Sequence, residues 1–378
     1  MQIAIAGDEV RIILRFLHSS SMLLRGHWGY RMRSVTTIHP SAGCFTPRRT
    51  GVVKLLLLTA ALAGVTLAAQ TSAFARPGQS SDEDDRQYAV RGLSLMMDGD
   101  LDGAVQVFEQ IQHKDPQSPV GFVLEANATW WKIYYDSANL IDPDVFDVAN
   151  MEATPYDSHF DDLIAVSLHK AEARIHAKED LARSNLYAGF AFALRARLEG
   201  LHDRDLPTAR AGKKMRTHLL RALELDPSLS DAYLGVGIYN YFVDTLPGIV
   251  KVLSIFIGLP GGSRTEGLKQ LQLCAEKGEL ARAEAKFYLA KDFSRSSEKQ
   301  YQKSLHLFQE LAHEFPNNPL WPTLAGSLEF RLDKPQQGDA IYREVYQKTA
   351  GKNSAVDVAV HHATGQALER LHPDQKFP

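Results

Sequence analysis

The stretch that decides the fold runs from residue 88 to residue 116 and reads YAVRGLSLMMDGDLDGAVQVFEQIQHKDP. Its apolar residues recur every three or four positions, which is the spacing of an amphipathic α-helix. Gly99 and Asp100 interrupt this spacing with turn-forming residues, and Pro116 ends it. The stretch therefore predicts two antiparallel helices joined by a short turn.

Small and large residues face each other across these two predicted helices. Tyr88, Gly92 and Leu95 fall on one face of the first helix, and Ala104 and Phe108 fall on one face of the second. Two helices can approach closely only where a small residue meets a large one. The pattern resembles the tetratricopeptide repeat (TPR). That resemblance implies an all-α fold, a TPR-like superhelical solenoid of antiparallel helix pairs that binds other proteins.

The same register returns along residues 85–371, where almost no alternating β-type run occurs. Phe308 and Tyr342 are 34 residues apart, which is one repeat length. We expect about six helical pairs and a terminal helix over Ala355–Leu371, enough to bury a continuous core. In the later pairs the repeat-packing residues are Tyr233, Gly237, Phe308, Pro316, Gly326 and Tyr342.

Two insertions depart from the repeat. Residues 136–160 form an acidic loop, and residues 246–262 read LPGIVKVLSIFIGLPGG and are almost entirely apolar. Prolines near both ends limit the second insertion to about three helical turns, too few to span a bilayer. Together with its flanks, over residues 180–295, it resembles the eukaryotic inclusion-body-clearance TPR family and its bacterial relatives. We expect it to fold back as structure; a membrane-surface contact stays open, although no basic face accompanies it.

The N-terminal region has the order of a secretory signal peptide over residues 51–75. Lys54 precedes an apolar stretch, and the small residues Ala73 and Ala75 suit a signal peptidase, so we expect cleavage after Ala75. Residues 1–50 show no sustained period and are interpreted as an upstream segment or an overcalled start. Residues 76–84 predict a flexible, acidic lead-in. The expected localisation is therefore periplasmic or secreted, and an association with the outer membrane stays open.

Charge and cysteine content narrow the classes of partner. The chain has 44% hydrophobic and 23% charged residues and a net charge of -3, an ordinary globular balance. Cleavage after Ala75 would leave 34 basic and 43 acidic residues, a net charge of -9, which disfavours nucleic acid. Cys274 would be the last cysteine, so no internal disulfide could form.

The sequence contains no convincing catalytic or metal-binding pattern. His313-Glu314 lacks a second histidine, and His361-His362 lacks a carboxylate within helical reach, so neither qualifies as a metal site. Cys274 falls at a small core position, where an inert thiol is expected. We therefore predict no catalytic residue, no metal and no cofactor, and a binding or scaffold protein rather than an enzyme.

The TPR resemblance implies a concave groove that binds a peptide or protein partner. The predicted groove lacks the set of lysines and asparagines with which TPR relatives hold a C-terminal carboxylate. Its aromatic residues offer a large contact area with few rotatable bonds. The candidate groove residues are Asn127, Trp130, Trp131, Leu234, Ile238, Tyr241 and Phe242.

Two alternatives to this groove stay open. Trp130 with Tyr134, and Trp131 with Tyr135, are i, i+4 pairs, and aromatic residues at that spacing more often belong to a packed core. The second alternative is a small-ligand or lipid-binding helical protein that uses the apolar insertion 246–262.

Overall fold

The computed structural model describes residues 79–137, 139–142, 153–246 and 258–377. These residues belong to one compact unit, Ser72–Pro378. The predicted upstream segment 1–50 and signal peptide 51–75 lie outside the described residues, as do 143–152 and 247–257 of the two insertions.

The described residues form thirteen helices and no strand, so the all-α prediction is confirmed. None of these helices combines the length and apolar character needed to cross a membrane. Their bounds are α2 Gln79–Met97, α3 Leu101–Lys114, α4 Val120–Ser137, α5 Asp157–Ala177, α6 Leu181–Leu201, α7 Asp205–Leu225, α8 Ala232–Thr245, α10 Arg264–Lys277, α11 Arg282–Ser294, α12 Tyr301–Glu314, α13 Leu320–Arg331, α14 Pro335–Thr349 and α15 Ala355–Leu371.

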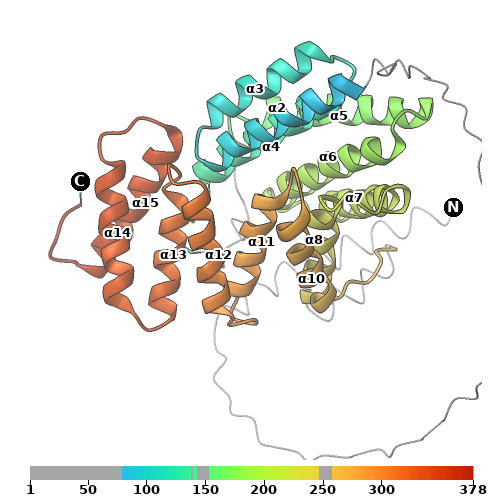
Figure 1. The fold of residues 1–378 in the computed structure, drawn as a ribbon. Coiled ribbons are helices and arrows are strands. Elements are labelled where there is room, and N and C mark those ends of the chain that lie inside the picture. Colours follow the sequence, from blue (N-terminus) through green and yellow to red (C-terminus); the bar gives the residue numbers. More distant parts are fainter. Residues whose placement is uncertain (1–78, 138, 143–152, 247–257, 378) are drawn as a thin grey trace, which may run out of the picture. The chain divides into compact units, whose positions relative to one another are not determined.

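Each helix packs against the one that follows it in the chain, from α2 to α15 (Figure 1). The described helices thus fall into six successive pairs with α15 at the end, which is the number of pairs expected from the sequence. The bounds of α15 also coincide with the predicted terminal helix. Ser354 begins this helix, because its hydroxyl accepts a hydrogen bond from the backbone N–H of Asp357 at 3.0 Å.

Glycine allows the two helices of a pair to come into contact. A Cβ placed on Gly92 of α2 would lie 2.3 Å from Phe108 Cε1 of α3, so no larger residue fits there without movement. The same relation holds between Gly326 of α13 and the ring of Tyr342 of α14, at 2.9 Å. Ala104, Phe108 and Phe308 are fully buried, and Tyr342 is 2% exposed. The predicted small-against-large packing is therefore present in these pairs.

The beginning of the helical region differs from the prediction in two ways. Helix α2 begins at Gln79, inside the segment 76–84 that was expected to be flexible. Tyr88 is 39% exposed and stacks under the Lys114 ammonium rather than between helices. No described helix precedes α2 to cover it.

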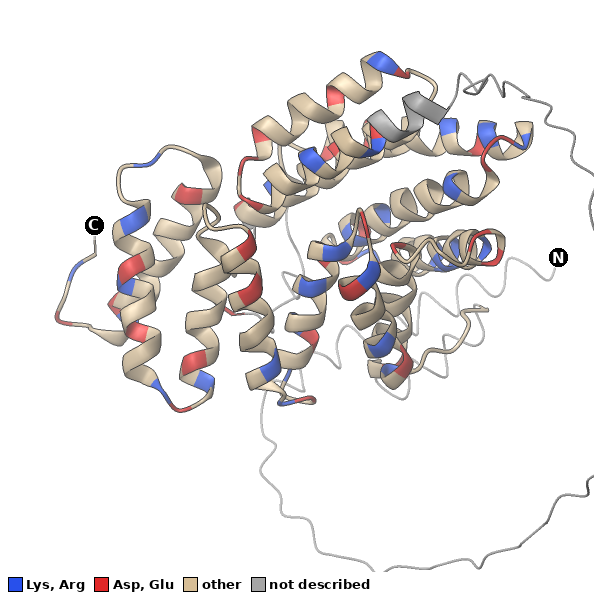
Figure 2. Cartoon of the chain, viewed as in Figure 1, with Lys and Arg blue, Asp and Glu red and all other residues tan. Residues whose placement is uncertain are grey.

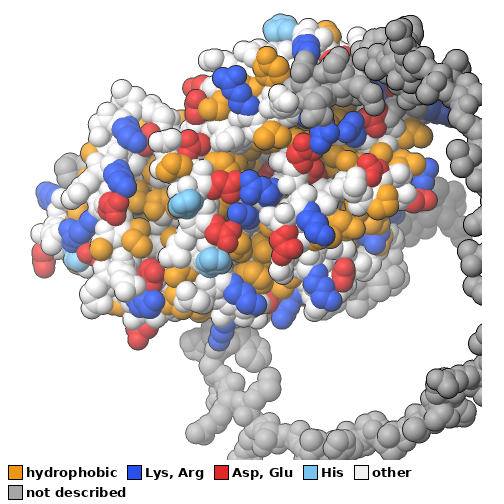
Figure 3. Space-filling view, viewed as in Figure 1, with side chains coloured by type: hydrophobic (Ala, Val, Ile, Leu, Met, Phe, Trp, Pro, Cys, Tyr) orange, Lys and Arg blue, Asp and Glu red, His pale blue; other side chains and the backbone are white. Residues whose placement is uncertain are grey.

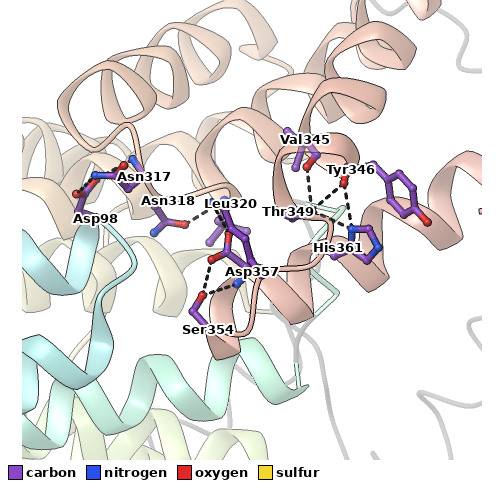
Figure 4. A network of polar contacts seen from close by, with 11 residues as sticks. Asp98, Asn317, Asn318, Leu320, Val345, Tyr346, Thr349, Ser354, Asp357 and His361 are labelled. Atoms are coloured by element: carbon purple, nitrogen blue, oxygen red, sulfur yellow. Dashed lines mark hydrogen bonds and ion pairs between the residues drawn. The ribbon is translucent and has the colours of Figure 1, made fainter. Parts of the chain in front are cut away.

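Contacts between distant pairs also join the turn after α2 to the segment before α13. The Met97 carbonyl accepts hydrogen bonds from Asn318 Nδ2 at 2.9 Å and from the Trp321 indole N–H at 3.0 Å. The neighbouring Asp98 carboxylate accepts from the backbone N–H and the side-chain amide of Asn317, as Figure 4 shows. Helix α15 in addition contacts α4. The first pairs are thus tied directly to the last ones.

Candidate functional site

The groove residues predicted on α4 lie mostly in the packed interior. Trp131 is 3% exposed, and its ring contacts Phe287 of α11 and Trp321 of α13, with centroids 5.1 and 6.0 Å away. Asn127, also buried, donates from Nδ2 to the Glu284 carboxylate at 3.0 Å. Trp130 is half-buried against Phe160. This differs from the predicted open groove, because α11 and α13 reach α4 and fill the space between them.

A buried ion pair lies beside Asn127 in this interior. Arg197 of α6 and Glu284 of α11 approach to 2.6 Å, with side chains only 15% and 8% exposed. The Arg197 guanidinium also stacks over the ring of Tyr288 at 4.9 Å. Burial opposes the charged form of Arg197, but the Glu284 carboxylate outweighs it and raises the pKa of Arg197. The Arg197 guanidinium therefore stays charged, and its contact with Glu284 joins α6 to α11.

The groove residues predicted on α8 do not join those on α4. Leu234 and Tyr241 are buried and Ile238 is half-buried. Tyr241 donates its hydroxyl to Glu298 at 3.2 Å, beyond the C-terminal end of α11, whereas Asn127 contacts the N-terminal part of α11. Burial raises the pKa of Tyr241, so this hydroxyl stays protonated and serves as a donor. Of the seven candidates, Phe242 alone is exposed, at 53%.

An open hollow lies instead along the outer edge of α2. It has a volume of about 480 Å³, which is within the usual range of small-molecule binding sites. We call it the α2 hollow. It is lined by Arg86, Gln87, Val90, Arg91, Ser94 and Leu95 of α2 and by Glu279, which precedes α11.

Charged and apolar groups meet in the α2 hollow. Arg86 Nη2 lies 2.6 Å from Glu279 Oε2, and this ion pair connects α2 to the loop between α10 and α11. Arg91 forms no ion pair with any described residue and is exposed. Val90 is 40% exposed and supplies apolar surface to the hollow. The hollow can therefore take an apolar side chain together with an acidic group.

A narrower cleft of about 40 Å³ adjoins the hollow and shares Arg86 with it. Here each arginine faces a carboxylate: Arg174 lies 3.9 Å from Asp115, and Arg183 lies 3.5 Å from Asp180. The cleft is thus close to neutral and offers hydrogen bonds rather than a net charge. Its remaining lining residues are Asp85, Ala89, Ser118, Pro119, Val120, Ser184, Tyr187 and Leu280.

Sequence reasoning did not point to Arg86, Glu279 or Glu284. Arg86 and Glu279 are 193 residues apart, and only the fold brings them together. Glu284 belongs to α11, where ten of thirteen residues are buried, several of them charged, so no apolar stripe marks its inner face. Charges of both signs are spread over the helices (Figure 2), and Figure 3 shows them mixed with hydrophobic side chains on one face.

Among the described residues, no three His, Cys, Asp or Glu side chains are placed to hold a metal ion. Cys274 is buried, and burial raises the pKa of its thiol well above the usual value. His361 stacks on Tyr346 and shares a hydrogen bond with Thr349, as Figure 4 shows.

No protein-family model matches this chain, and no curated protein matches its sequence.

Proposed function

We propose that this chain is an exported TPR-like helical-repeat protein that binds a peptide or protein partner. The glycine-against-ring packing at Gly92 and Phe108 supports the TPR-like assignment, because it is the contact that this repeat requires. The successive pairing of the described helices agrees with stacked repeats. The function proposed is binding rather than catalysis.

The α2 hollow is the surface that we propose for this partner. It is the observation that carries the proposal, since it combines about 480 Å³ of open space with exposed Val90 and with Arg91, which has no ion-pair partner in the part of the chain that the structure describes. The predicted groove residues Trp131 and Tyr241 are buried and cannot reach a partner in this structure. A partner segment with an apolar side chain next to an acidic one fits the hollow best.

Site-specific photo-crosslinking tests this proposal. A photoreactive phenylalanine derivative at Val90 should give discrete protein adducts in cells, identified by mass spectrometry. The matched control is the same residue at Val358 of α15, which is 53% exposed and far along the chain from the hollow. Adding Arg91→Glu to the Val90 version should abolish the adducts. Equal crosslinking from both positions, or adducts unaffected by Arg91→Glu, would contradict the assignment.

Export is the second part of the proposal and has its own test. The order of basic, apolar and small residues over 51–75 supports it. Cell fractionation should place the protein outside the cytoplasm, and sequencing its N-terminus should start at Arg76. Full-length protein retained in the cytoplasm would show that the proposed address is mistaken.

A further inference from the structure

Helix α7 carries a stripe of positive charge on its solvent-exposed side. Arg210, Lys213, Lys214 and Arg221 are all exposed and lie within about 100° of the helix circumference. We call these four residues the α7 stripe. Lys and Arg residues lie along this helix in Figure 2, with acidic residues close to its ends. The stripe is a local excess of positive charge on a chain whose net charge is -3.

Little of this charge is neutralised within the protein. Arg221 pairs with Glu224 at 2.7 Å, and the Lys214 ammonium lies over the ring of Phe192 at 5.0 Å. Arg210 and Lys213 form no ion pair with any described residue. The two cations at the N-terminal end of the stripe are therefore available to an external anion.

One apolar side chain and a backbone segment border the same side of α7. Leu220 is 36% exposed, although it is a large hydrophobic residue. The backbone at Gly258 lies next to the stripe, because a Cβ there would be 3.2 Å from Lys213 Nζ. Tyr239 holds the backbone just after Gly258 in place, because its hydroxyl donates a hydrogen bond to the Pro260 carbonyl at 2.8 Å. The stripe thus combines positive charge with adjoining apolar surface.

We propose that the α7 stripe binds the surface of a lipid bilayer that contains anionic phospholipids. Cations attract the phosphate-bearing headgroups, and a neighbouring exposed leucine can enter the interfacial region. This partner fits better than nucleic acid, whose binding usually needs several more phosphate contacts than two available cations provide. The sequence alone showed no basic face for a membrane contact, and the structure supplies one on α7.

Vesicle cosedimentation of the full chain tests the proposal. The two probes are vesicles of phosphatidylcholine alone and vesicles that also contain phosphatidylserine. The measured quantity is the binding to phosphatidylserine-containing vesicles minus the binding to phosphatidylcholine vesicles. This difference cancels any charge-independent binding by the apolar residues 55–69. The gain should fall as NaCl is raised. Arg210→Gln with Lys213→Gln should lower the partition coefficient to phosphatidylserine vesicles about tenfold to thirtyfold.

The matched control removes two exposed cations elsewhere. Lys269 and Lys277 of α10 are exposed and form no ion pair with described residues, so Lys269→Gln with Lys277→Gln changes the net charge equally. Unchanged thermal unfolding of both variants would show that they fold. Equal losses in the two variants would mean that net charge alone acts, and would overturn the proposal. Binding to a DNA oligonucleotide without a phosphatidylserine-dependent gain would overturn it as well.

Discussion

The α2–α3 pair and helix α11 are stabilised by different kinds of contact. The first depends on an apolar fit between Gly92 and Phe108, which are 16 positions apart in one continuous motif. The second has buried charges, Glu284, Lys291 and Asp292, at 7%, 1% and 4% exposure. Local contacts set the geometry of a helix pair, whereas contacts with distant helices decide where α11 lies.

Long-range polar contacts concentrate on α11. Glu284 contacts Arg197 of α6 and Asn127 of α4, and the Lys291 ammonium lies over the ring of Tyr134 of α4 at 5.4 Å. Each of these charges would be costly to bury alone. This protein thus uses apolar packing to form helix pairs and buried charge to arrange the pairs relative to one another.

The largest effect should follow from breaking the buried ion pair. Glu284→Gln leaves the Arg197 guanidinium without its carboxylate in a mostly buried position. We expect a loss of about 3 kcal/mol in the free energy of unfolding. Urea denaturation monitored by circular dichroism measures this loss.

The double substitution Arg197→Met with Glu284→Met is the control for that experiment. It removes both charges and keeps most of the side-chain volume, so it should recover most of the stability lost in Glu284→Gln. A single variant as stable as the parent would show that buried charge does not arrange α11, and the comparison would fail.

A somewhat smaller effect is expected in the α2–α3 pair. Gly92→Ala places a Cβ 2.3 Å from Phe108 Cε1 and should cost about 2 kcal/mol through overpacking. The matched control is Gly212→Ala in α7, where the nearest atom, on Tyr239, is 3.9 Å away. That control should gain about 0.5–1 kcal/mol from helix propensity. Thermal unfolding of both variants should shift in opposite directions; shifts of the same sign would refute the close fit.

The smallest effect concerns pH and Asp292. Burial raises the pKa of this carboxyl to about 7, although Arg295 lies 3.3 Å away and opposes the shift. A raised pKa means that the protonated form favours folding, so its contribution is present at low pH and is lost as pH rises from about 4 to about 7. Asp292→Asn should therefore gain about 1–2 kcal/mol relative to the parent as the pH rises from about 5.5 to about 7. A pH-independent difference in urea midpoints would contradict the raised pKa.

Most helices could be predicted from the sequence because their determinants are local. The small-large spacing of Gly92 and Phe108 marks a pair, and Ser354 marks the start of α15. Helix α11 was not delimited, because RAEAKFYLAKDFS places charged residues on faces that the fold buries. Periodicity identifies an inner face only when that face is apolar.

The candidate site was less predictable than the fold. Trp131 was assigned to a groove by its register, but its surroundings depend on Phe287 and Trp321, which are 156 and 190 positions further along the chain. The α2 hollow likewise depends on Glu279, and no local sequence pattern indicates that Glu279 lies beside α2. Residue spacing within one pair carries no information about which distant pair lies opposite.

The bond between the Trp321 indole and the Met97 carbonyl, across 224 positions, also has a consequence for synthesis. In a stack where each unit contacts only its neighbours, the first pair can complete its structure as soon as it leaves the ribosome. Here the turn after α2 receives these donors only once residue 321 has emerged. The first helices therefore reach their final contacts only after nearly the whole chain has been synthesised.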